Sequence, residues 1–118
     1  MIRISLLLIY LLFPFSLYAA GDLTEQNPIE VTVSLGNAKD NLRFYPDSLQ
    51  FETGKLYKLV IRNPSKQKHY FSSEGLARSV FTRKVQVVGA DNKTLVEVKG
   101  SISEIEVYPG HAAEWWFV

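Results

Sequence analysis

Cysteine is absent from this chain of 118 residues. Its absence excludes disulfide bonds within the sequence, thiolate metal ligands and a cysteine nucleophile. Methionine is almost as scarce, since Met1 is the only one. A small domain without disulfides needs another source of stability, so we expect a packed core, a partner or a metal to supply it.

The sequence also lacks a charge excess and the common catalytic motifs. It contains 13 basic and 12 acidic residues, and this balance argues against a nucleic-acid-binding protein. No G-x-S-x-G, P-loop or H-E-x-x-H pattern is present. Glu104 and Glu106 could mimic a carboxylate pair, but the solvated face of a strand explains their spacing better. We therefore expect that the protein is not an enzyme.

The first twenty residues have the layout of a secretory signal peptide. Arg3 supplies a positive charge, residues 5–17 form an apolar run, and Ala19 and Ala20 are small enough for cleavage. The run contains Pro14 and is shorter than the ~20 apolar residues of a membrane-spanning helix. The sequence thus predicts a signal peptide over 1–20, a flexible leader over 21–28, and a periplasmic or secreted protein without a stable membrane span after cleavage.

From residue 29 onward the hydrophobic pattern has a period of two, which is typical of half-buried strands. Short strands are predicted at 29–35, 56–63, 84–88, 94–98, 102–107 and 114–118, with further extended segments near 44–51 and 69–71. Residues 73–78 allow one or two helical turns. About seven short strands separated by turn signals favour an antiparallel β-sandwich or barrel. We predict one all-β domain over residues 29–118, and the lack of βαβ alternation argues against a Rossmann-type enzyme.

Two histidines are the candidate ligands of this sequence. His69 follows a strand and a polar loop and is followed by two aromatic residues, so its ring could be partly shielded. His111 follows the Pro109-Gly110 turn, where a solvated loop histidine is the simpler interpretation.

The order of these features resembles the first half of a cupredoxin-like domain, the β-sandwich of plastocyanin and azurin. The residues that carry the resemblance are Phe44, Pro46, Leu49, Phe51, Gly54, Tyr57, Leu59, Ile61 and Asn63, followed by His69 and Phe71. The later stretch Val107-Tyr108-Pro109-Gly110, the segment 81–85 and the Glu-Trp-Trp-Phe-Val ending are similar to an exported bacterial subfamily of these proteins. The resemblance spans about residues 29–118 and implies a Greek-key sandwich.

The resemblance also implies copper binding or electron transfer, with a periplasmic redox protein as partner and His69 as the first copper ligand. The other ligands of a type 1 site are a cysteine, a second histidine and usually a methionine. They would follow the strand that corresponds to 114–118, so we expect the last strand and the ligand loop to be missing and the site to be incomplete.

His111 is not expected to replace the second histidine. If the strands at 56–63 and 114–118 both run toward the His69 end, the Pro109-Gly110 turn lies at the opposite end. Six strand residues would then put His111 about 20 Å from His69, whereas two imidazoles on one metal each approach it to about 2 Å.

The alternative is a metal-free β-sandwich that acts as an interaction module. An uncovered sheet edge would then accept a strand from another protein chain.

Overall fold

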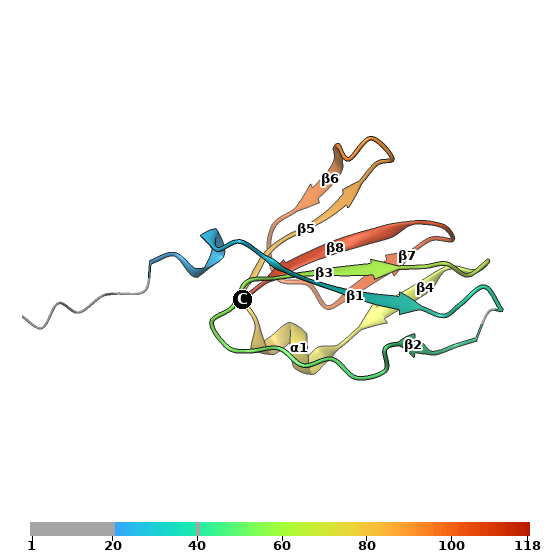
Figure 1. Cartoon of the computed structure of the whole chain (residues 1–118), viewed down its shortest axis with the longest axis horizontal. Helices are drawn as coiled ribbons and strands as arrows, with labels where there is room; N and C mark the ends of the chain where they lie inside the picture. The colour runs from blue at the N-terminus through green and yellow to red at the C-terminus, as the bar shows by residue number, and fades with distance from the viewer. Residues whose placement is uncertain (1–20, 40) are drawn as a thin grey trace, which may run out of the picture.

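The computed structural model describes residues 21–39 and 41–118, which form two β-sheets of unequal size (Figure 1). The larger sheet has six strands in the order β2-β1-β3-β8-β5-β6, and the smaller sheet pairs β4 with β7. The elements are β1 (Ile29–Leu35), β2 (Phe44–Tyr45), β3 (Tyr57–Arg62), β4 (His69–Ser72), α1 (Glu74–Ser79), β5 (Thr82–Val88), β6 (Thr94–Val98), β7 (Glu104–Val107) and β8 (Ala112–Phe117).

This architecture confirms the predicted all-β sandwich. It adds one feature that the period-two pattern does not contain, because β1 pairs with β3 in parallel while the other pairings are antiparallel. Val33 lies opposite Ile61 in this parallel pair. Both strands run toward the same end of the sandwich, and the segment that contains β2 returns the chain between them (Figure 1).

The core lies between the two sheets and is built on β3 and β8. Leu59 and Ile61 of β3 are fully buried, and Trp115 and Phe117 of β8 face the same core. The ring centroids of Trp115 and Phe117 lie 5.1 Å apart, and Phe51 meets Phe117 edge-to-face at the same distance. Such aromatic contacts favour burial beyond the area that they cover.

The direction of β8 differs from the expectation. β8 runs antiparallel to β3, with Ala112 opposite Arg62 and Phe117 opposite Tyr57. The assumption that both strands run toward the His69 end was therefore wrong. The Pro109-Gly110 turn lies at the end where β3 finishes, and the amide of Gly110 donates to the carbonyl oxygen of Asn63 at 2.8 Å.

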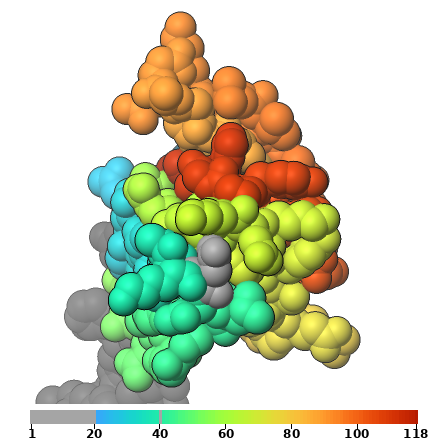
Figure 2. Space-filling model, turned by 90° about the vertical axis from the view of Figure 1, so that its right-hand side faces the viewer, coloured from blue at the N-terminus to red at the C-terminus, as the bar shows by residue number. Residues whose placement is uncertain are grey.

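The β5–β6 hairpin projects from the sandwich, and Figure 2 shows it in orange above the end formed by residues 36–45 and 60–72. β5 pairs with β8 only from Thr82 to Gln86, and every residue of β6 is exposed. No helix in the described ranges is long and apolar enough to cross a membrane.

The predicted leader contains a 3-10 helix (Leu23–Glu25), and the side-chain amide of Gln26 donates to the carbonyl oxygen of Gly54 at 2.9 Å. The predicted signal peptide at 1–20 lies outside the described residues.

Candidate functional site

His69 is the first residue of β4 and is half-buried beside the end of β1. Its Nε2 atom is buried and has no hydrogen-bond partner in the part of the chain that the structure describes. A Cβ atom added to Gly36 would lie 3.5 Å from this nitrogen, so the backbone of Gly36 packs directly against the ring. Buried polar atoms are nearly always satisfied in native proteins, and an exception calls for a physical explanation such as a bound ion.

Asn63 holds the loop that brings the chain from β3 to His69. Its amide nitrogen donates to the carbonyl oxygens of Gln67 at 2.6 Å and Val107 at 2.7 Å. Its amide oxygen accepts from the backbone nitrogen of Ser65 at 3.0 Å and from the Ser65 hydroxyl at 2.7 Å. Val107 lies opposite His69 in the small sheet, so one buried side chain ties β3, the loop and β7 together.

Two contacts fix β4 on either side of His69. Lys68 and Glu106 form an ion pair at 3.2 Å, and the hydrogen bond from Lys68 to Glu106 raises the pKa of the lysine. Phe71 is buried and stacks on Phe44, with 5.4 Å between the ring centroids. The His69 ring is thus positioned by a strand that is anchored before and after it.

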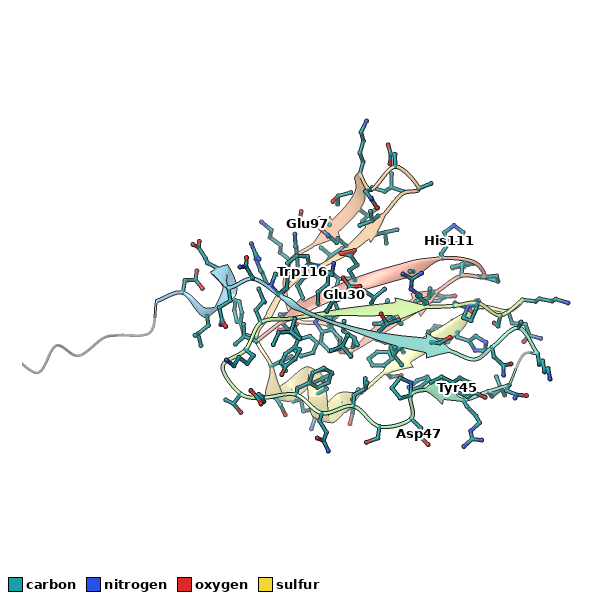
Figure 3. All side chains as sticks on the ribbon, viewed as in Figure 1. Glu30, Tyr45, Asp47, Glu97, His111 and Trp116 are labelled. Atoms are coloured by element: carbon teal, nitrogen blue, oxygen red, sulfur yellow. The ribbon has the colours of Figure 1, made fainter. Side chains whose placement is uncertain are left out.

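His111 lies at the same end of the sandwich as Asn63. The backbone nitrogen of Asn63 donates to the backbone carbonyl oxygen of His111 at 3.0 Å. Its ring is exposed and stands outside the sandwich (Figure 3). The Nδ1 atom lies 2.8 Å from the carbonyl oxygen of Pro109. Because a carbonyl only accepts, Nδ1 carries the proton in this contact. The predicted separation of the two histidines by the length of a strand was wrong, but the ring of His111 points away from the core.

The described residues do not form a type 1 copper site by themselves. The sequence contains no cysteine, and no group of three or more His, Cys, Asp or Glu side chains in residues 21–39 and 41–118 could hold a metal ion. The donor set therefore does not fit a complete His₂Cys centre. What the chain offers is one inward-facing histidine in a rigid frame.

A second feature is an apolar cleft of about 650 Å³ between the two layers. Residues 44–54 line one wall, and the end of β4 with α1 lines the other. Val33, Tyr57 and Phe117 form its floor on the large sheet. The cleft exists because the large sheet has six strands and the small sheet has two, so part of the inner face is left uncovered. The sequence predicted an uncovered edge, but it did not indicate where the cleft would lie.

Comparison of the sequence with models of protein families and with curated proteins finds no match.

Proposed function

We propose that this is an exported cupredoxin-like protein that takes part in copper binding or electron transfer, with His69 as one copper ligand. The buried Nε2 of His69, which lacks a hydrogen-bond partner in the described part of the chain, is the observation that supports this proposal. A neutral imidazole nitrogen is a common metal ligand, and leaving it buried without a partner costs about 1–3 kcal/mol. A bound metal ion would remove that cost.

The frame around His69 supports the same role. Asn63 makes four hydrogen bonds that hold the loop before His69, and the backbone of Gly36 packs against the ring. The ligands that complete a type 1 site, above all a thiolate, are not in this sequence. We therefore expect weak copper binding by these residues alone, without the intense colour that a copper–thiolate bond produces.

The test is a copper titration of the chain together with the variants His69→Ala and His111→Ala. Both variants remove one imidazole, but only His69 faces the interior. We expect His69→Ala to abolish copper uptake and the nitrogen hyperfine signal in electron paramagnetic resonance, and His111→Ala to leave both in place. Unchanged uptake in His69→Ala would overturn the proposal, and a blue complex would show that the ligand assignment is wrong.

A second candidate function is strand acceptance, which the cleft between the layers favours. In the described part of the chain β4 pairs only with β7, so its other edge is free to bind an extended segment beside the apolar floor. Added strands of this kind bind through backbone hydrogen bonds and place alternate side chains in pockets.

Peptides selected on the chain from a random library would test this candidate. We expect the selected peptides to carry apolar residues at every second position. Gly75 lines the cleft, and a Cβ atom there meets nothing within 4 Å, so Gly75→Trp should obstruct the cleft and weaken peptide binding. Gly21→Trp is the matched control, because Gly21 is equally open and lies outside the cleft. Equal binding to both variants would exclude the cleft as the site.

A further inference from the structure

The outer face of the large sheet carries a cluster of cations around one tryptophan. Trp116 is half-buried on β8, the strand between β3 and β5 (Figure 3). The Lys84 ammonium lies 4.5 Å from the centroid of its ring, the Arg83 guanidinium 5.5 Å and the Lys58 ammonium 5.8 Å. Cations at these distances are attracted by the ring, but their charge is not neutralised by it.

A β-bulge brings two of these cations to the same side. In a regular strand, consecutive side chains point to opposite faces, so Arg83 and Lys84 would be separated by the sheet. Here Thr82 lies opposite Phe117 and Lys84 lies opposite Trp116, which leaves Arg83 as an extra residue on β5. Bulges of this kind re-aim side chains and are common beside functional sites. This one places two adjacent cations over one ring.

The carboxylates on this face have other partners. Glu30 forms an ion pair with Lys58 at 2.6 Å. Glu114 accepts from Gln86 at 3.0 Å and from the Trp116 indole at 3.3 Å. The hydrogen bond from the Thr24 hydroxyl at 2.7 Å is the largest cause of the lowered pKa of Asp22, and the charge of Arg83 is the smallest. No carboxylate of the described residues forms an ion pair with Arg83 or Lys84.

We propose that Arg83 and Lys84 form a binding site for a phosphate group over Trp116. A phosphate that carries up to two negative charges can satisfy both cations at once, whereas a carboxylate can neutralise only one. The guanidinium supplies a planar pair of donors that matches two phosphate oxygens, and the lysine adds a point charge beside it. Contact with the ring limits the movement of both side chains, so less entropy is lost when the anion binds. This site is independent of the role proposed for His69.

The experiment follows the fluorescence of Trp116 while inorganic phosphate is added to the chain. Trp115 is buried on the opposite face, and its indole donates to Thr82, so it should respond little. Trp116→Phe should remove the response and thereby identify the reporter. Loss of charge-assisted hydrogen bonds predicts an affinity at least about tenfold weaker in the double variant Arg83→Gln/Lys84→Gln. The matched control is Lys39→Gln/Lys93→Gln, which removes two exposed charges from loops outside the cluster.

A second arm distinguishes free phosphate from a phospholipid headgroup. Vesicles of phosphatidylcholine with and without phosphatidylglycerol are titrated into the same variants. A lipid source predicts that only the vesicles with phosphatidylglycerol bind and that Arg83→Gln/Lys84→Gln weakens this binding. If the site binds free phosphate, inorganic phosphate alone should give the full change in Trp116 fluorescence. Three results would overturn the site: no response to phosphate or vesicles, an unchanged affinity in the double variant, or an equal loss in the lysine control.

Discussion

Asn63 and His69 show how much of this fold depends on single polar side chains. Asn63 is only 1% exposed. Its side-chain amide forms hydrogen bonds with backbone groups of the loop and of β7, so its own polar atoms are satisfied as well. His69 is the opposite case, because its buried Nε2 has no partner in the described part of the chain. The first residue stabilises the frame, and the second leaves a nitrogen inside it that a ligand can use.

Replacement of Asn63 by alanine should destabilise the fold. The change removes four hydrogen bonds and leaves the carbonyl oxygens of Gln67 and Val107 without this donor. Unsatisfied buried groups cost about 1–3 kcal/mol each, so we expect the free energy of unfolding to fall by roughly 2–4 kcal/mol in a urea titration. Asn27→Ala, at an exposed position, should change it little. If Asn63→Ala lowers the free energy of unfolding no more than Asn27→Ala does, the hydrogen bonds of Asn63 do not stabilise the fold.

The ion pair between Glu30 and Lys58 gives a prediction about pH. The hydrogen bond from Lys58 lowers the pKa of Glu30, and the same bond raises the pKa of Lys58. Because the pKa of Glu30 is lower in the folded than in the unfolded state, its stabilisation is complete above the unfolded pKa and is lost as the pH falls through the folded one.

The corresponding measurement compares the urea midpoint of the chain with that of Glu30→Gln from neutral to acid pH. We expect the chain to be the more stable of the two at neutral pH and the difference to vanish below the ordinary titration range of glutamate, about pH 4. The raised pKa of Lys58 keeps the pair intact on the alkaline side until that lysine loses its proton. A difference that stays constant down to acid pH would contradict the assignment.

β8 carries two adjacent tryptophans that face opposite sides of the large sheet. Trp115 and Phe117 point into the core, and Trp116 between them points to the outer face. Strand alternation alone accounts for this division. The partner strands on either side decide what each face meets, because β3 and β5 place Lys58, Arg83 and Lys84 around Trp116.

The antiparallel pairing of β3 with β8 can be tested by cross-linking, since the chain has no cysteine of its own. Val60 lies directly opposite Glu114, and opposite residues in an antiparallel pair have Cα atoms about 4.5–5.5 Å apart, within the range of a disulfide. We expect Val60→Cys/Glu114→Cys to form a disulfide on mild oxidation, measured by loss of free thiol. Val60→Cys/Ala112→Cys is two positions out of register, at roughly 7–8 Å, and should react poorly. Preferential closure of this second pair would show that the register is different.

For the whole molecule, the main property is the imbalance between its layers. A six-stranded sheet faces a two-stranded one, which leaves an apolar cleft between the layers. Figure 1 shows that the β5–β6 hairpin projects from the sandwich. Burial is therefore concentrated on β1, β3 and β8. Stability should follow the same distribution.

Amide hydrogen exchange would measure that distribution. Local opening is easiest where few apolar contacts are made. We expect the amides of β3, which is paired on both edges, to exchange slowest, and those of β6, which is exposed throughout, to exchange fastest. Val85 and Gln86 of β5 are the internal control, because they are paired on both edges but lie next to β6. Protection of β6 equal to that of β3 would mean that the hairpin is covered by another chain.

The sequence by itself determined the class of fold and nearly all the strands. Alternation of apolar and polar residues, together with turn residues such as those at 91–93 and 109–110, is a local property, and it predicted β1, β3, β6 and the core face of β8 closely. It also indicated that the ring of His69 could be partly shielded, because a polar loop precedes it and aromatic residues follow it.

The tertiary structure alone decided which strands are neighbours and in which direction they run. A period of two is the same for parallel and antiparallel strands, so the sequence could not show that β8 runs opposite to β3 and brings His111 to the Asn63 end. It could not show the bulge at Arg83 either, because a bulge is defined by the partner strand. The cleft and the cation cluster depend on the same pairings, so they appear only when distant segments are assembled.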